Sequence, residues 1–216
     1  MKILTYYTDE NKKMYKNFFL RSFNDVLRKS FKLDAKYLNE PSEDIMMDKI
    51  EYVIDNIDVG SKDLLIFSSC GSQFFRDFHE DIEEELENNN ILFQGDIVGA
   101  SSNFFVCRQN EETLEFFNTV LFMMKKHMTD KRYKRKLSDQ DVINIIINNG
   151  NSTGIGILPK DKYYNVSAST GDKQWEADKD FEVPPSIMVH NSSWSNDTKD
   201  KIRLMRVVKN KVLGIL

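Results

Sequence analysis

The chain has 216 residues, of which 40% are hydrophobic and 30% are charged, a composition typical of globular proteins and not of disordered or fibrous ones. Its 30 basic and 34 acidic residues give a formal net charge of −4, which does not predict bulk affinity for nucleic acid. Only two cysteines are present, which excludes a disulfide scaffold and a cysteine-rich zinc module.

No segment of the sequence resembles a membrane span or a secretory signal. The first ten residues, MKILTYYTDE, become polar too early for the apolar region of a signal peptide. No apolar run approaches the roughly 18 residues that a spanning helix needs. We therefore expect a cytoplasmic protein that has no membrane span and does not bind nucleic acid.

Apolar runs and helical periodicity alternate along the chain. Short apolar runs predict strands, and apolar residues spaced by three and four predict amphipathic helices. In chain order the patterns predict a strand over 2–7, a helix over 14–27, a strand over 34–38, a helix from Ser42 to 57, a strand over 63–68, an acidic helix over 78–90, strands over 91–93 and 103–108, a helix over 111–128, a basic stretch over 131–136, a helix capped by Ser138, a strand over 155–158, an irregular segment over 163–185, a strand over 187–190 and a helix from Lys199 onward.

The alternation of strands and helices predicts an α/β fold with a mostly parallel central sheet and helices on both faces. The sequence contains no internal repeat and no interdomain linker. We expect one domain over residues 1–216.

Several common site types are missing from the sequence. There is no Walker loop and no G-x-G-x-x-G motif, and Gly154-Ile-Gly156 is interpreted as a turn. Cys70 and Cys107 have no thiolate-activating pattern beside them, so both are interpreted as buried, unreactive thiols.

Three polar clusters border the predicted strands, where open α/β sheets bind their ligands. They are 68–73 (SSCGSQ), 138–141 (SDQD) and 190–194 (HNSSW). Taken alone, each has a structural explanation: a turn, a helix cap and a surface loop.

In their order along the chain these clusters resemble the nucleotide-diphospho-sugar transferase family of the GT-A fold. The best-matching stretches are 91–94, 103–117, 138–144, 158–159, 164–165 and 189–191. More distantly, the chain is similar to the glycogenin and bacterial galactosyltransferase group. The resemblance implies a single GT-A domain, a nucleotide-sugar donor (a UDP-sugar in preference to a GDP-sugar) and a hydroxyl acceptor on a glycan or a protein.

The resemblance also implies a set of donor-binding residues. Thr8 and Asp9, which follow the first strand, would hold the base, and Asn103 begins a matching stretch near the donor. Lys199 would contact the phosphates. His190 stands where relatives place a third metal ligand.

The chain departs from the family at the D-x-D motif, whose two carboxylates hold Mn²⁺ or Mg²⁺ against the diphosphate. Ser69 and Gly71 occupy the two positions. One explanation is that lysines and arginines replace the metal, because the diphosphate requires positive charge. The other is that catalysis has been lost. If a metal is held after all, Asp9, Asp96 and His190 are the ligands to examine.

Asp139 and Gln140 are the candidate catalytic residues. By the resemblance, Asp139 binds sugar hydroxyls and Gln140 lies near the anomeric carbon, opposite the leaving group. Alternatively, Asp139 could stabilise the helix that Ser138 caps, because an acidic side chain in the first turn interacts favourably with the helix dipole. We therefore expect a retaining glycosyltransferase with reduced or absent metal dependence, or alternatively a catalytically silent protein that binds nucleotide sugars or acts as a scaffold.

Overall fold

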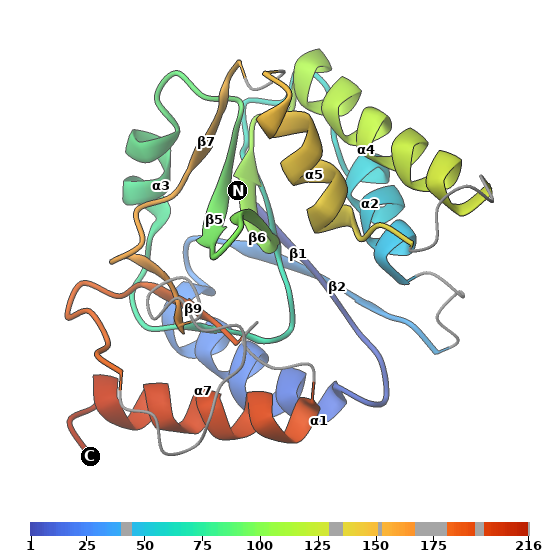
Figure 1. Ribbon diagram of the computed structural model, residues 1–216. Helices are drawn as coiled ribbons and strands as arrows, with labels where there is room; N and C mark the ends of the chain where they lie inside the picture. Colours follow the sequence, from blue (N-terminus) through green and yellow to red (C-terminus); the bar gives the residue numbers. More distant parts are fainter. Residues whose placement is uncertain (40–44, 130–135, 151–152, 167–180, 193–196, 216) are drawn as a thin grey trace.

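The computed structural model describes residues 1–39, 45–129, 136–150, 153–166, 181–192 and 197–215 (Figure 1). A six-stranded sheet in the order β2-β1-β3-β6-β5-β7 forms its centre. Within it, β6 alone runs antiparallel to both of its neighbours, whereas β1 pairs in parallel with β2 and β3, and β5 with β7. The predicted α/β fold with a mostly parallel sheet is therefore confirmed. The strands are β1 (Lys2–Tyr7), β2 (Lys32–Tyr37), β3 (Leu65–Ser68), β5 (Ile91–Asp96), β6 (Gly99–Cys107) and β7 (Ile155–Ile157).

Helices cover both faces of this sheet because its strands are apolar on both faces. Successive side chains of a strand point to opposite faces. Ile3 and Ile66 accordingly pack into one core, while Leu4 and Leu65 pack into the other. The first core is covered by α1 (Lys12–Met14), η1 (Tyr15–Leu20), η2 (Phe23–Leu27) and α3 (His79–Leu86), and the second by α2 (Ile45–Asp55), α4 (Glu111–Thr129) and α5 (Asp139–Asn148) (Figure 1).

A second, three-stranded sheet lies below the first and was not predicted. It consists of β4 (Ser72–Phe74), β9 (Val189–Asn191) and β8 (Tyr163–Asn165), with β9 in the centre. The helix α7 (Thr198–Val212) packs Leu204 and Val208 against it. The segment predicted to be irregular thus begins with a strand, because Tyr163 and Tyr164 are almost fully buried.

The element boundaries differ from the predicted ones in several places. The strand β6 begins at Gly99, four residues earlier than predicted, and α3 ends at Leu86 and not at residue 90. The helix expected over 14–27 is present but consists largely of the wide π turns η1 and η2. The strand β2 begins two residues earlier than predicted, and β5 extends to Asp96. Ser42 and residues 131–135 lie outside the described residues. None of the described helices has both the length and the apolar character that crossing a bilayer requires.

Candidate active site

A polar cleft of about 220 Å³ lies at the carboxyl ends of β1 and β3, the edge where the sequence predicts the donor site. The segment after β1, the loop after β3, the end of β9 and the start of α7 all contribute to it. Its lining residues are Tyr6, Glu10, Asn11, Met14, Ser69, Cys70, Gly71, Asn103, Asn191, Ser192, Thr198 and Lys201. Of the predicted donor-binding residues, the cleft therefore brings together Ser69, Gly71 and Asn103.

The loop 69–71, where the sequence analysis expects the D-x-D positions, is held by the end of β9. The Asn191 amide donates hydrogen bonds to the hydroxyls of Ser69 (2.9 Å) and Ser72 (3.1 Å). Ser192 donates to the Gly71 carbonyl from both its backbone N–H (3.1 Å) and its hydroxyl (2.9 Å). A Cβ on Gly71 would lie only 2.8 Å from the Ser192 hydroxyl oxygen. Position 71 therefore cannot carry a carboxylate unless Ser192 moves.

These residues do not fit a hard divalent cation, which takes several oxygen ligands and favours carboxylates. Ser69 offers a hydroxyl that already accepts a hydrogen bond, and Gly71 offers no side chain. Among the described residues no group of three His, Cys, Asp or Glu side chains is placed to hold a metal ion.

His190 does not line the cleft. Alternation along β9 directs Asn191 into the cleft and His190 to the opposite face of the small sheet. The imidazole is fully buried, with Nδ1 3.4 Å from the Gln73 amide oxygen and Nε2 without a hydrogen-bond partner. Burial lowers the pKa of His190 to about 3.

Thr8 and Asp9 flank the cleft without lining it. The backbone N–H of Thr8 donates to the Asn11 side chain (2.8 Å), and exposed Asp9 pairs with Lys12 (3.2 Å). The neighbouring Glu10 and Asn11 reach the cleft in their place.

Among the described residues, the basic side chain that lines the cleft is that of Lys201 and not that of Lys199. The side chain of Asp197 caps α7 by accepting from the backbone N–H of Lys199 (2.6 Å). The Lys199 side chain is exposed and does not line the cleft, whereas that of Lys201 does. Burial raises the pKa of nearby Cys70 to about 12, and the positive charge of Lys201 partly opposes this rise.

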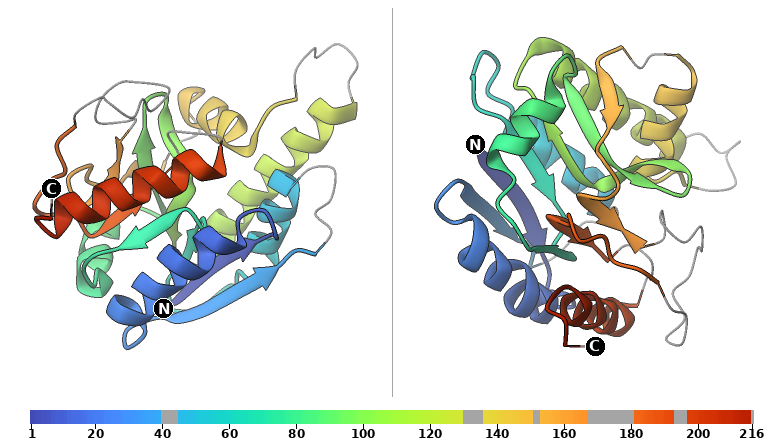
Figure 2. Two further views of the ribbon diagram at one scale, coloured as in Figure 1. Left: turned by 90° about the horizontal axis from the view of Figure 1, so that it is seen from below. Right: turned by 90° about the vertical axis from the view of Figure 1, so that its left-hand side faces the viewer.

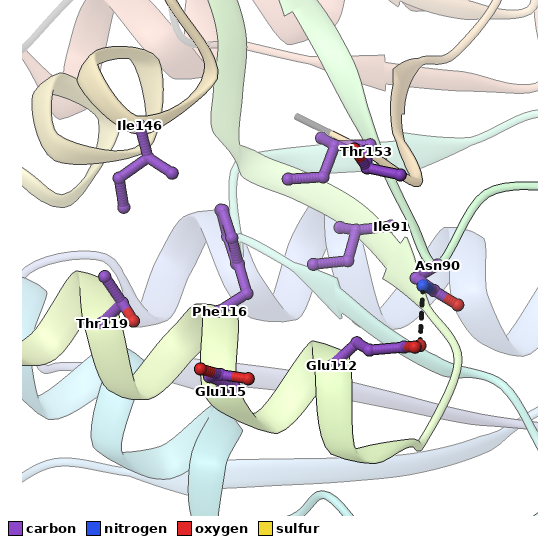
Figure 3. A pocket seen from close by; sticks show the side chains of 9 residues that line it. Asn90, Ile91, Glu112, Glu115, Phe116, Thr119, Ile146 and Thr153 are labelled. Carbon is purple, nitrogen blue, oxygen red and sulfur yellow. Dashed lines mark hydrogen bonds between the residues drawn. The ribbon is translucent and has the colours of Figure 1, made fainter. Parts of the chain in front are cut away.

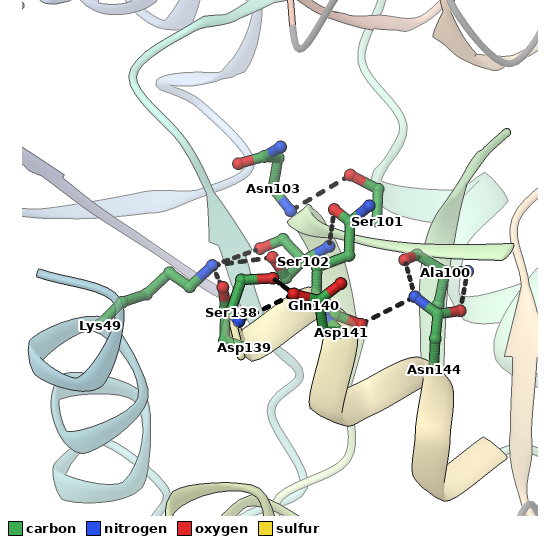
Figure 4. A network of polar contacts seen from close by, with 10 residues as sticks. All are labelled: Lys49, Ala100, Ser101, Ser102, Asn103, Ser138, Asp139, Gln140, Asp141 and Asn144. Carbon is green, nitrogen blue, oxygen red and sulfur yellow. Dashed lines mark hydrogen bonds and ion pairs between the residues drawn. The ribbon is translucent and has the colours of Figure 1, made fainter. Parts of the chain in front are cut away.

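Asp139 lies at the start of α5, where Ser138 and Asp141 form a capping box. Its carboxylate is buried and forms an ion pair with Lys49 of α2 (Figure 4), the two side chains being 3% and 5% exposed. The Lys49 ammonium also donates to the Ser102 carbonyl (3.1 Å) and hydroxyl (3.0 Å). Asp139 does not line the cleft, but its charge acts on Tyr6, which does: the pKa of Tyr6 is raised first by burial and then by the charge of Asp139. The position of Asp139 in the first turn of α5 is therefore compatible with a second role near the cleft.

Gln140 is oriented by two contacts. Its amide oxygen accepts a hydrogen bond from the backbone N–H of Ser102 (3.4 Å; Figure 4). Its amide nitrogen donates to Asp96 (3.0 Å) at the end of β5. Asn144, one turn later, pairs with the backbone of Ala100 through both ends of its amide (2.8 and 2.9 Å). These contacts fix the start of α5 against the β5–β6 hairpin, next to Asn103 of the cleft.

The nucleotide-diphospho-sugar transferase family model matches residues 18–205, which include this cleft except for its β1 side. The chain belongs to this family. The predicted resemblance is confirmed, and with it the assignment to a family of glycosyltransferases. No curated protein matches the sequence at a significant level.

Solved glycosyltransferases share the fold of this family member. GlyE of Streptococcus pneumoniae TIGR4 is 12% identical with a TM-score of 0.62 over 98% of this chain. A glycosyltransferase involved in the glycosylation of the major capsid of PBCV-1 is 8% identical with a TM-score of 0.65, covering 96% of this chain and 98% of that one. The galactosyltransferase LgtC, solved with donor and acceptor sugar analogues, is 10% identical with a TM-score of 0.53 over 96% of both chains. The present chain spans 60% of the length of GlyE.

A second cavity, of about 260 Å³, lies at the opposite edge of the sheet (Figure 3). It is lined by Asn90 and Ile91 at the amino end of β5, Ile155 of β7 and Glu112 and Phe116 of α4. Glu112 accepts a hydrogen bond from Asn90 there (3.0 Å). Open α/β sheets bind their ligands at the carboxyl ends of their strands, whereas this cavity lies at the amino end of β5.

The sequence analysis missed Lys49 and the pair Glu10 and Asn11. Lys49 could have been found, because it interrupts the apolar face of the helix over 45–57 at the spacing of a buried position. Asn191 and Ser192 lay within the polar cluster 190–194, but their role in holding the loop 69–71 depends on how β9 meets β4, which no local pattern encodes.

Proposed function

We propose that this family member transfers a sugar from a nucleotide-diphosphate donor, a UDP-sugar in preference to a GDP-sugar, to a hydroxyl group of a glycan or protein. The reaction proceeds with retention, in the cytoplasm, and residues 1–216 act as one domain. The observation that carries the proposal is the polar cleft at the carboxyl edge, with Lys201 in its wall and Asp139 behind Tyr6.

The diphosphate end of the donor lies at the loop 69–71 and the start of α7. The negative charge of a leaving diphosphate must be neutralised by positive charge. Either a lysine side chain or a metal ion can supply it. Lys201 is the cation that lines the cleft. We propose that it takes this role and that donor binding depends only weakly on Mn²⁺ or Mg²⁺.

The sugar end of the donor lies toward the start of α5. A transition state of oxocarbenium character is stabilised by nearby carboxylate charge and amide dipoles. Asp139 supplies buried negative charge held in place by Lys49, and Gln140 supplies an amide held by Asp96. The acceptor hydroxyl approaches from the open side of the cleft, on the same face of the sugar as the leaving phosphate.

The test is calorimetry with a panel of UDP- and GDP-sugars, in EDTA and in Mn²⁺, on the wild type and two lysine variants. Loss of a charge-assisted contact costs about 1.5–3 kcal/mol, so Lys201→Ala should weaken donor binding by roughly 10- to 150-fold. Lys199→Ala is the matched control at an exposed position two residues earlier and should bind the donor like the wild type.

Three outcomes would contradict parts of the proposal. Donor binding that disappears in EDTA would show that a metal is held. Weaker donor binding in Lys199→Ala but not in Lys201→Ala would show that the phosphates lie at Lys199. Tight donor binding without release of free nucleotide, with or without acceptors, would favour the catalytically silent alternative. The anomeric configuration of the product tests retention.

A further inference from the structure

Positive charge is concentrated on two helical segments of a chain that is acidic overall. Residues 12–29, which span α1, η1 and η2, contain six basic residues and one acidic residue. Residues 198–212, which form α7, contain another six basic residues and one acidic residue. The whole chain carries a net charge of −4, so the rest of the chain, apart from the basic stretch 131–136, has a large excess of acidic residues. Such segregation creates a local field far stronger than the net charge implies.

The two segments lie on one face of the molecule, on either side of β4 (Figure 2, left). They run in parallel, because their starts share the polar cleft, where Asn11 and Met14 face Thr198 and Lys201. Their later parts share a groove that is lined by Arg21 and Val26 on one side and by Lys209 and Leu213 on the other. We call residues 12–29 and 198–212 together the basic face.

Most of the cations on the basic face point outward. Its exposed basic residues are Lys13, Lys16, Arg21, Arg28, Lys29, Lys199, Arg203 and Arg206. Its two acidic residues are Asp25, which lies 4.0 Å from Arg21, and Asp200 at the start of α7. Two more acidic residues, Asp9 and Glu10, lie just before residue 12. The inner sides of both segments are buried in the core through residues such as Phe19 and Leu204, so the helices lie flat with their charged sides outermost.

We propose that the basic face docks the protein on an anionic phospholipid bilayer. Charge complementarity carries the proposal, because each Lys or Arg near an anionic membrane surface contributes about 1 kcal/mol of binding free energy. Leu213 and Ile215, which follow α7, are 56% and 66% exposed and supply the aliphatic contact that accompanies such basic surfaces. Single-stranded nucleic acid fits less well, because it binds on exposed aromatic platforms, and the exposed apolar side chains beside the groove are aliphatic.

The position of Lys201 links this surface to the cleft. Lys201 belongs to α7 and also lines the cleft, so the basic face extends to the rim of the cleft. A protein docked through this face would hold the cleft close to the lipid headgroups.

The test is co-sedimentation of the full chain with vesicles, which requires no knowledge of the donor or acceptor. The probes are vesicles of phosphatidylcholine alone and of phosphatidylcholine with about 30% phosphatidylglycerol, an anionic lipid. The wild type should bind only the anionic vesicles. It should be released near 1 M salt, where the Debye length falls to about 3 Å.

A matched pair of charge-reversal variants locates the surface. The triple variant Lys13→Glu, Lys16→Glu and Arg206→Glu should bind at least about 100-fold more weakly, as the contribution of each cation predicts. The control triple variant Lys62→Glu, Lys126→Glu and Lys160→Glu changes the net charge equally at exposed positions off the basic face and should bind within a few-fold of the wild type.

Circular dichroism and thermal unfolding of both variants establish that they remain folded. Equal losses in the two triple variants, binding to neutral vesicles, or no vesicle binding by the wild type would overturn the proposal. Both proteins are also tested for binding to duplex DNA. If the wild type binds duplex DNA but not vesicles, and the basic-face variant loses that DNA binding, the face is assigned to nucleic acid instead.

Discussion

Replacement of His190 by glutamine should reduce the loss of stability that the protein suffers in mild acid. The imidazole is fully buried between Gln73 and Tyr164 of the small sheet, and burial lowers its pKa to about 3. In the unfolded chain the pKa is near its ordinary value of 6.5. Between these two values the unfolded state binds a proton that the folded state does not, so the folded state loses stability as the pH falls.

The magnitude follows from the two pKa values. One pKa unit corresponds to about 1.4 kcal/mol. Between pH 7 and pH 5 the unfolded state becomes almost fully protonated at this site, which costs the wild type about 2 kcal/mol of unfolding free energy. Near pH 3, where the folded state begins to accept the proton, the cost approaches about 5 kcal/mol. Glutamine retains hydrogen-bonding capacity but has no proton to gain, so the contribution of this site disappears.

The assay is urea unfolding at pH 7 and at pH 5, with the slope m required to be the same at both values. The difference in unfolding free energy between the two pH values should be about 2 kcal/mol smaller in His190→Gln than in the wild type. His79→Gln, at a partly exposed position on α3, is the matched control and should retain the difference. An unchanged pH difference in His190→Gln would refute the assignment of the acid sensitivity to this buried imidazole.

Further predictions concern the two sides of the cleft. Asp139→Ala should lower the free energy of unfolding by about 3–5 kcal/mol, because it leaves the Lys49 ammonium buried without its counter-charge; an acidic residue that acted only on the helix dipole would account for about 0.3–1 kcal/mol. Lys49→Met combined with Asp139→Leu should recover much of that loss in the same urea experiment. Gly71→Ala should cost about 0.5–1.5 kcal/mol, because the new Cβ forces the Ser192 hydroxyl away from the Gly71 carbonyl to which it donates. If Ser192→Gly fails to relieve that cost in a double-mutant cycle, the collision is not its cause.

The elements of the large sheet were predictable from the sequence because their signals are local. The continuous apolar run of β3 and the periodicity of α4 need no tertiary information, and the capping box of Ser138 with Asp141 is likewise present as predicted. The strand β4 was missed because it has three residues and becomes a strand only through its pairing with β9. The π turns η1 and η2 share the apolar spacing of an α-helix, so the pattern does not distinguish them.

The sequence predicted which polar segments lie together at one edge of the sheet, but not which side chains reach the cleft there. The order of the polar clusters located the loop 69–71 and the start of α5 correctly at one edge of the sheet. His190 was placed on the wrong side of β9, because one residue of register moves a side chain to the opposite face. Lys199 and Lys201 differ by two positions at the start of a helix, and only the direction of α7 decides which of them reaches the cleft.

The close contact between Gly71 and Ser192 bears on how this site could evolve. A single codon change to aspartate at position 71 would collide with Ser192 before the new carboxylate could meet any ion, and the partner position 69 would still hold a serine engaged by Asn191. A carboxylate at position 71 therefore requires the Ser192 hydroxyl to leave the Gly71 carbonyl, and one at position 69 requires Asn191 to give up its hydrogen bond to the Ser69 hydroxyl. The choice of residue in the loop 69–71 is thus coupled to the choice of residue at the end of β9.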